Sequence, residues 1–202
     1  MDSRKAPLRF RLECLNIFRK FYSFPIADAY YNFCKIKGDF TICFELYEKL
    51  KENYSKWESE KKQENGLFYQ IDDRDGMEYS ISGHGLRPTI NSYMFADSIA
   101  LSKIADMLGK QDEENYYKGK AEALRKLIDE NLWDEDACFY KNLSEDLGYK
   151  KSDLREEIGY VPRCYNIPDE DKSKAWKFFM DDNYFAAPCG ITTAERNHPR
   201  FM

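Results

Sequence analysis

The stretch Arg74-Asp75-Gly76-Met77-Glu78-Tyr79-Ser80-Ile81-Ser82-Gly83 continues as His84-Gly85-Leu86-Arg87-Pro88-Thr89-Ile90-Asn91-Ser92-Tyr93 and divides the chain. Segments with helical periodicity lie on both sides of it. Its own three glycines, its proline and its many charged and hydroxyl side chains are not typical of an amphipathic helix. The stretch is therefore predicted to be a functional loop between rigid helices, where binding and catalytic groups concentrate.

The composition is that of a globular protein. The 202 residues allow one domain with a real hydrophobic core, and 43% hydrophobic residues with 16% aromatic residues exclude a disordered or fibrous chain. The formal net charge of −5 comes without a long basic run, so we expect neither nucleic acid nor a membrane surface as a partner. No apolar run has membrane-spanning length and no secretory signal is apparent, which predicts a cytoplasmic protein.

Cysteine and histidine usage gives no sign of a metal site. The six cysteines are scattered without a C-x-x-C pair, and the chain has only two histidines. The usual zinc spacings are absent, so we expect free thiols, no metal and no cofactor.

On the N-terminal side of the loop, the spacing of apolar residues predicts three helices. The first covers residues 8–22, the second begins at Ile26 and ends at Gly38, and the third begins after Asp39 and runs through Trp57 towards the turn signal Asn65-Gly66. Residues 66–71 are predicted to lead into the loop as an extended segment.

On the C-terminal side, Pro88 is predicted to open a helix that ends at Gly109, a second helix runs from Asp112 to Leu132, and a last helix runs from Pro168 through Phe179. Residues 138–141 are predicted to form one short strand, and residues 155–162 a second non-helical polar segment. The helices follow one another as hairpins without alternating strands, which predicts an all-α fold and excludes a parallel α/β sheet.

Asp97 lies on the apolar stripe of the predicted helix after Pro88. A carboxylate on such a stripe needs hydrogen-bond donors or a charged partner. An ion pair with a nearby arginine and a role in a functional site are both left open by the sequence.

The loop holds Asp72, Asp73, Asp75 and Glu78 within seven residues. The alternate-residue spacing of an EF-hand is missing. One interpretation is a carboxylic acid that acts as general acid, as in glycoside hydrolysis, and the other is a solvated acidic loop. The polar side chains that would suit a polyhydroxylated ligand are Arg74, Arg87, Asn91, Tyr93 and Arg155.

Four motifs in a fixed order carry a family resemblance. They are D-G-M-E-Y-S-I-S-G at 75–83, R-P-T-I-N-S-Y-M at 87–94, R-E-E-I-G-Y-V-P at 155–162 and T-T-A-E-R-N-H-P at 192–199. The chain, from about Ser23 to its last residue, resembles the (α/α)6-toroid or six-hairpin glycosidases. It is most similar to glycoside hydrolases allied to mannosylglycerate hydrolase, with trehalase and processing α-glucosidase as relatives. The resemblance implies helical hairpins that form part of an (α/α)6 toroid.

The resemblance also implies roles for individual residues. Glu78 stands where those families carry the general acid, usually Asp, and Asp75 and Asp73 are the alternative acids. The implied substrate-binding residues are Arg74, Arg87, Asn91, Tyr93, Arg155, Glu156, Tyr160 and Glu195. Pro25, Arg163 and Cys189 depart from the pattern because relatives tend to have aromatic residues there.

The family pattern continues beyond Met202 and carries its second catalytic carboxylate there. Residues 1–202 are therefore expected to be a partial toroid domain truncated at its C-terminus, with apolar stripes such as that of residues 90–108 partly exposed. The expected function is inverting hydrolysis of α-linked glucosides or related small saccharides, with this chain supplying the general-acid half and inactive alone. The alternative is a non-catalytic pseudoenzyme or carbohydrate-binding module. The expected partners are a carbohydrate and the missing half-domain or a second copy.

Overall fold

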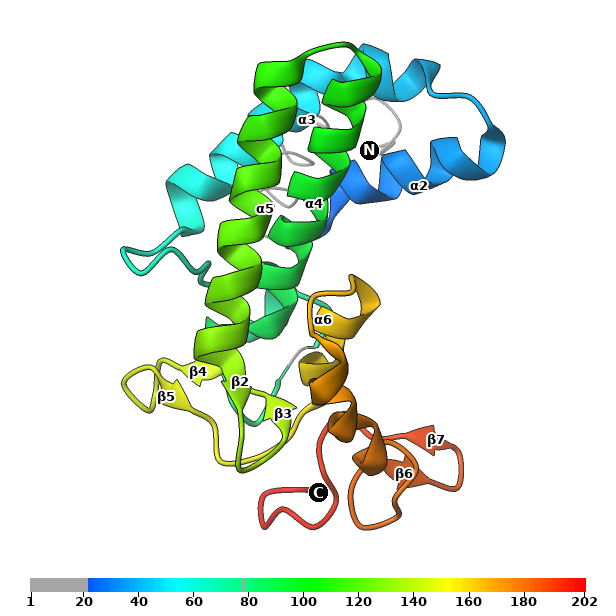
Figure 1. Ribbon diagram of the computed structural model, residues 1–202. Coiled ribbons are helices and arrows are strands. Elements are labelled where there is room, and N and C mark those ends of the chain that lie inside the picture. Colours follow the sequence, from blue (N-terminus) through cyan, green and yellow to red (C-terminus); the bar gives the residue numbers. More distant parts are fainter. Residues whose placement is uncertain (1–21, 78) are drawn as a thin grey trace, which may run out of the picture.

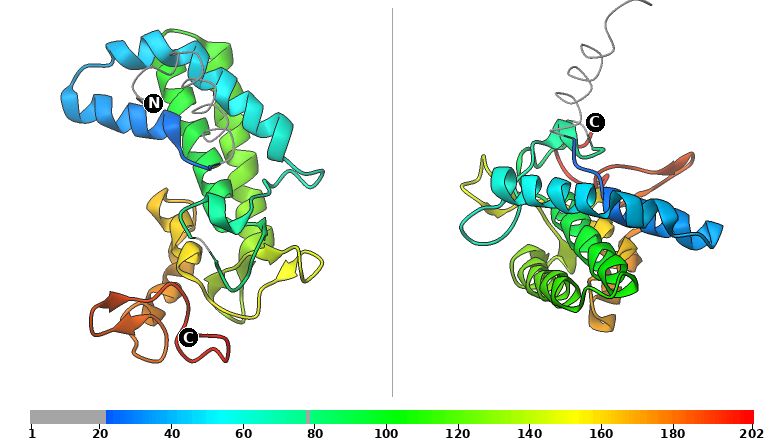
Figure 2. Two further views of the ribbon diagram at one scale, coloured as in Figure 1. Left: turned by 180° about the vertical axis from the view of Figure 1, so that it is seen from behind. Right: turned by 90° about the horizontal axis from the view of Figure 1, so that it is seen from above.

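The computed structural model describes residues 22–77 and 79–202. Four long helices form its upper part in Figure 1: α2 (Ile26–Lys37), α3 (Thr41–Lys61), α4 (Pro88–Met107) and α5 (Gln111–Leu132). Helices α4 and α5 run side by side as an antiparallel hairpin, and α2 and α3 pack against α4. Figure 2 shows from above that α2 and α3 form a separate layer across this hairpin.

The shorter elements gather around the start of α4 and the end of α5 (Figure 1). An antiparallel sheet has the order β1 (Gly85–Leu86), β4 (Leu143–Ser144), β5 (Lys150–Lys151). Two hairpins pair β2 (Trp133–Asp134) with β3 (Phe139–Tyr140) and β6 (Ala186–Ala187) with β7 (Gly190–Ile191). Short helical turns are η2 (Asp72–Arg74), η3 (Glu157–Tyr160), α6 (Val161–Cys164) and η4 (Glu170–Phe178). The central loop and these short elements thus lie together at one end of the α4–α5 hairpin (Figure 1).

Helix α4 is the centre of the core. Pro88 occupies its first turn, where the fixed φ of proline suits a helix and its missing N–H is not needed. Almost every residue of α4 from Pro88 to Ala105 is buried, which is typical of a helix surrounded by other elements. The predicted exposure of the stripe at residues 90–108 is therefore wrong for most of its length, because Ile90, Met94, Leu101 and Ile104 are covered.

The other long helices agree with their sequence signals. Helix α2 ends at Gly38 and α4 is followed by Gly109, and both glycines have the left-handed φ that ends helices. Helix α3, helix α5 and the short strand at residues 138–141 are confirmed as well. Residues 8–21 of the predicted helix at 8–22 lie outside the described residues. No helix in the described part of the chain is both long and apolar enough to cross a bilayer.

Several segments differ from prediction: one short strand was expected, whereas the described residues form β1 to β7. The segment after Pro168 is the 3-10 helix η4 rather than an α-helix, and its three-residue repeat puts Ala175 and Phe178 on one buried face. Residues 155–162, predicted to be non-helical, contain η3 and the first turn of α6. Gly159 permits this turn, because a Cβ there would lie 2.2 Å from a ring carbon of Phe139 and 2.3 Å from the Tyr140 carbonyl oxygen.

Asp97 takes neither of the two expected roles in the described structure. Its Oδ1 accepts backbone hydrogen bonds from Ala27 (2.9 Å) and Asp28 (3.1 Å), in the first turn of α2. Pro25 precedes that turn and offers no side-chain cap of its own. A carboxyl from α4 therefore satisfies the open amides of a neighbouring helix, in place of an ion pair with arginine.

Candidate functional site

A pocket of about 490 Å³ opens where the central loop meets η3 and α6. This volume lies in the range of small-molecule sites. The loop contributes Asp75, Gly76 and Met77 to its lining, and α4 contributes Thr89 and Tyr93. The remaining lining residues come from later in the chain and are Glu157, Ile158, Tyr160, Val161, Arg163, Cys164, Trp176, Phe179 and Ile191.

Aromatic rings form one wall of this pocket. Tyr160 stacks on Trp176 with ring centroids 5.2 Å apart and an interplanar angle of 17°. Phe179 meets both rings edge-on, at 5.4 Å from Tyr160 and 5.7 Å from Trp176. Burial raises the pKa of Tyr93 to about 12, so its phenol is a neutral hydrogen-bonding group at ordinary pH. The wall therefore offers apolar ring faces, and Tyr93 adds a phenol, whereas the Tyr160 hydroxyl donates to the Ala175 carbonyl oxygen (3.1 Å).

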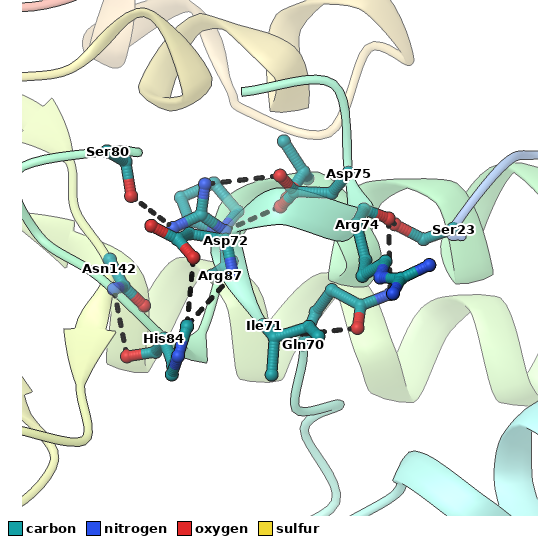
Figure 3. Close-up of polar contacts among 12 residues, drawn as sticks. Ser23, Gln70, Ile71, Asp72, Arg74, Asp75, Ser80, His84, Arg87 and Asn142 are labelled. Atoms are coloured by element: carbon teal, nitrogen blue, oxygen red, sulfur yellow. Dashed lines mark hydrogen bonds and ion pairs between the residues drawn. The ribbon is translucent and has the colours of Figure 1, made fainter. Parts of the chain in front are cut away.

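Asp75 and Arg87 form a buried ion pair at the edge of the pocket (Figure 3). Nε of Arg87 donates to Oδ2 of Asp75 at 2.5 Å and Nη2 donates to Oδ1 at 3.2 Å, and the Thr89 hydroxyl also donates to Oδ2. Burial raises the pKa of the Asp75 carboxyl, while the charge and hydrogen bonds of Arg87 oppose the shift. Both carboxyl oxygens are thus occupied by protein donors.

Arg87 also fixes the shape of the loop. Its Nη1 donates to the Ser80 hydroxyl (2.8 Å) and to the Gly83 carbonyl oxygen (2.5 Å). The Arg87 side chain has no exposed surface. One guanidinium therefore ties together residues 75, 80 and 83, so the loop is held by a residue predicted to bind substrate.

Glu156 holds the same loop from the opposite segment of the chain. Its Oε1 accepts the backbone N–H groups of Ile81 (2.7 Å) and Ser82 (3.2 Å), and burial raises the pKa of its carboxyl. Next to it, Nη1 of Arg155 donates to Oε2 of Glu195 at 2.7 Å, and Arg155 also donates to the Ala137 carbonyl oxygen. These three predicted ligand residues bind protein groups.

The remaining predicted residues either bind protein groups or line the pocket. Asn91 accepts the Phe68 N–H (2.8 Å) and donates to the Phe68 and Arg87 carbonyl oxygens. Asp73 and Arg74 form a loose pair, 3.8 Å apart, on η2. Asp75, Tyr93 and Tyr160 are the predicted residues that line the pocket as described, and Glu78 lies outside the described residues.

Several lining residues had no signal in the sequence. In the sequence, Trp176 is one apolar position of a predicted helix, and Glu157 is one charged residue of a polar segment. Arg163 stands out in the sequence only as a departure from a family pattern. Among residues 22–77 and 79–202, no group of three or more His, Cys, Asp or Glu side chains is placed to hold a metal ion.

The chain matches a known family and a known protein sequence. Residues 18–202 match the family described as mannosylglycerate hydrolase MGH1-like glycoside hydrolase domain. An uncharacterized protein of Borreliella burgdorferi is 29% identical over 189 residues, which are 88% of this chain and 38% of that protein. The chain thus spans less than half the length of this curated relative.

Solved structures share the fold. A protein named as a sialidase has a TM-score of 0.85 at 38% identity, over 91% of this chain and 17% of its own. The GH63 mannosylglycerate hydrolase of Thermus thermophilus, solved in complex with glucose, has a TM-score of 0.73 at 12% identity, over 91% of this chain and 57% of its own. An uncharacterized conserved protein of the same organism has a TM-score of 0.75 at 13% identity, over 91% of this chain and 59% of its own. The described helices therefore form part of a helical toroid, as predicted.

Proposed function

Because the chain belongs to the mannosylglycerate hydrolase MGH1-like glycoside hydrolase domain family, we propose that it takes part in inverting hydrolysis of α-linked glucosides or related small saccharides. One observation carries this proposal. The acidic loop lines the pocket through Asp75, Gly76 and Met77, directly before the predicted acid, and the same pocket has an aromatic wall. Aromatic faces with a few fixed polar groups are typical of sites for small polar ligands.

We assign the general acid to Glu78 rather than to its neighbours. Both oxygens of Asp75 already accept hydrogen bonds from Arg87 and Thr89, so Asp75 is poorly placed to give a proton to a leaving group. The side chain of Asp73 is half exposed and does not belong to the pocket lining as described. A general acid must keep its proton near working pH, which requires a pKa raised from about 4.3 towards about 6.

Inversion also needs a second carboxylate, at roughly 6.5–9.5 Å from the acid, that activates a water molecule. We propose that this base lies outside the 202 residues, since the chain spans only part of its relatives. Glu157 is the competing choice, because it lines the pocket together with the loop. A sugar-binding module without hydrolysis is the alternative function, and the same pocket would serve it.

The test compares the wild-type protein expressed from the complete reading frame with Glu78→Gln and Asp73→Asn, with α-linked disaccharides as substrates. Glu78→Gln should lower the rate by roughly 10²–10⁴-fold and keep sugar binding, because only the proton donor is removed. Asp73→Asn is the matched control and should keep the rate. The first product, followed by NMR, should be the β-anomer.

Other results would contradict parts of this proposal. Full activity of Glu78→Gln with an inactive, folded Asp75→Asn would move the acid to Asp75. Hydrolysis by the 202-residue chain, abolished in Glu157→Gln, would make Glu157 the base. Sugar binding without any hydrolysis by the complete protein would support the binding module.

A further inference from the structure

Arg163 differs from Arg87 and Arg155. Arg87 is paired with Asp75, and Arg155 is paired with Glu195. Arg163 lines the pocket, yet its Nε and Nη2 are shielded from solvent and have no hydrogen-bond partner within the described part of the chain. A shielded guanidinium edge without an acceptor is costly, so its presence calls for a physical reason.

The surroundings of Arg163 offset the free-energy cost of burying its charge only in part. The guanidinium carbon lies 5.4 Å from the ring centroid of Trp176, in cation–π contact. Burial lowers the pKa of Arg163, whereas the nearby Tyr140 and Tyr160 oppose the shift. The group stays charged, because a guanidinium does not lose its proton in proteins. A full positive charge is therefore held at the pocket wall against an aromatic ring, and no ion pair among the described residues compensates it.

We propose that Arg163 recognises an oxyanion, a carboxylate or a phosphate, on the sugar ring that the pocket holds. This proposal rests on the proposed function for the sugar itself. Nε and Nη2 form one edge of the guanidinium, and such an edge pairs side-on with two oxygens of an anion. Both nitrogens are shielded in the structure, so the proposal requires the terminal side-chain torsions of Arg163 to rotate until this edge faces the pocket, where the ligand supplies the missing acceptors.

Charge in the rest of the lining sets the orientation of such a ligand. The carboxylate of Asp75 is compensated by Arg87, so it repels an anion only weakly. Glu157 also lines the pocket and forms no ion pair among the described residues. Its carboxylate repels an anion but accepts hydrogen bonds from hydroxyls. The acidic group should therefore lie at Arg163, with sugar hydroxyls towards Glu157.

The experiment measures binding of methyl α-glucuronide, glucose 6-phosphate and methyl α-glucoside to the 202-residue chain at low salt. Tryptophan fluorescence is the readout, because Trp176 is half exposed at the pocket while Trp57 and Trp133 are buried. At least one acidic sugar should bind about 10-fold or more tightly than the neutral glucoside, as expected for a charge-assisted pair. Arg163→Gln should abolish this preference and Arg163→Lys should keep part of it.

The control is Arg200→Gln, which removes an exposed guanidinium that pairs with Asp153 and should leave the preference intact. Tighter binding of methyl α-glucuronide identifies a carboxylate as the ligand group, and tighter binding of glucose 6-phosphate identifies a phosphate. Equal affinity for acidic and neutral sugars, a preference that survives in Arg163→Gln, or no binding of any sugar would overturn the proposal. If Arg163→Gln does not fold, an unchanged preference in Arg163→Lys at both low and high salt would overturn it. An intact preference without any hydrolysis by the complete protein would count against the proposed function alone.

Discussion

Arg87 shows at the scale of one residue how a polar side chain of a loop can serve the fold. Its guanidinium is fully covered and donates to Asp75, Ser80 and Gly83. Lysine has one ammonium group and cannot reproduce a planar fork with several donors. The residue is therefore expected to act through the loop that it holds.

We predict that Arg87→Lys lowers the free energy of unfolding by roughly 3 kcal/mol, because it leaves the buried Asp75 carboxylate poorly paired. A thermal or urea melt followed by circular dichroism measures the effect. The matched control is Arg200→Lys, an exposed pair, which should change stability by less than about 1 kcal/mol. An unchanged melt combined with weaker sugar binding would show instead that Arg87 contacts the ligand.

Asp97 gives a second prediction at this scale. Burial raises the pKa of its carboxyl from 3.8 to about 8 in the folded chain. The folded state therefore holds a proton that the unfolded chain releases above about pH 4, so this group favours folding at low pH and loses that contribution as the pH rises towards 8. The free energy of unfolding of the wild type, relative to that of Asp97→Asn, should therefore fall between about pH 4 and pH 8.

The amide of Asp97→Asn can still accept the N–H groups of Ala27 and Asp28 but carries no charge at any pH. Asp97→Ala is the control, because it removes the acceptor that caps α2. Its free energy of unfolding should be lower than that of the wild type by about 1 kcal/mol or more at every pH. Urea melts between pH 4 and pH 8 give both differences. A constant difference between wild type and Asp97→Asn would show that Asp97 does not titrate in this range.

At the scale of elements, the segment formed by η3 and α6 depends on close backbone approach. Gly159 lies against β3, and an added methyl group would meet the ring of Phe139 and the backbone oxygen of Tyr140. The backbone oxygen cannot turn away as a flexible side chain can. The element that carries Tyr160 and Arg163 is thus positioned by the absence of a side chain.

We predict that Gly159→Ala destabilises the fold by about 1–3 kcal/mol and shifts the pocket wall. Gly119→Ala is the matched control, since Gly119 lies inside α5 with nothing within 4 Å of an added Cβ. That change should raise stability by about 0.5–1 kcal/mol, because alanine is the better helix former. Equal melting temperatures for the two variants would contradict the close approach at β3.

At the scale of the whole molecule, the apolar residues of α4 are buried, and the exposed apolar surface lies elsewhere. Phe33 and Ile36 on α2 are 51% and 86% exposed, although they follow the helical periodicity of that element. Exposed apolar surface of this kind promotes association. We therefore propose that a second copy of the chain makes contacts at α2.

We predict that the 202-residue chain self-associates with rising concentration and that Ile36→Lys weakens this association without lowering the melting temperature, because Ile36 contributes little to the core. Sedimentation velocity gives the association and a melt gives the stability. Leu101→Lys is the contrasting variant, since Leu101 is fully buried and its replacement should unfold the chain. A wild-type chain that stays monomeric at all concentrations would contradict the prediction.

The sequence by itself determined the four long helices, most of their ends and the family. Helical periodicity and stop signals such as Gly38 and Gly109 depend on neighbouring residues, so they can be found without tertiary contacts. The four separated motifs predicted the glycosidase family and the toroid, which the family match and the structural neighbours confirm. The same motifs predicted a functional loop, and the pocket beside that loop is seen only in the tertiary structure.

The tertiary structure alone decided what each polar residue of these motifs contacts. Arg155 meets Glu195 across 40 residues, and Glu156 meets Ile81 across 75, so no local pattern records either pair. Arg163 and Trp176 become pocket residues only because η3, α6 and η4 fold back onto the loop. The physical reason is that helix formation is governed by short-range spacing, whereas the partner of a buried charge is set by long-range packing.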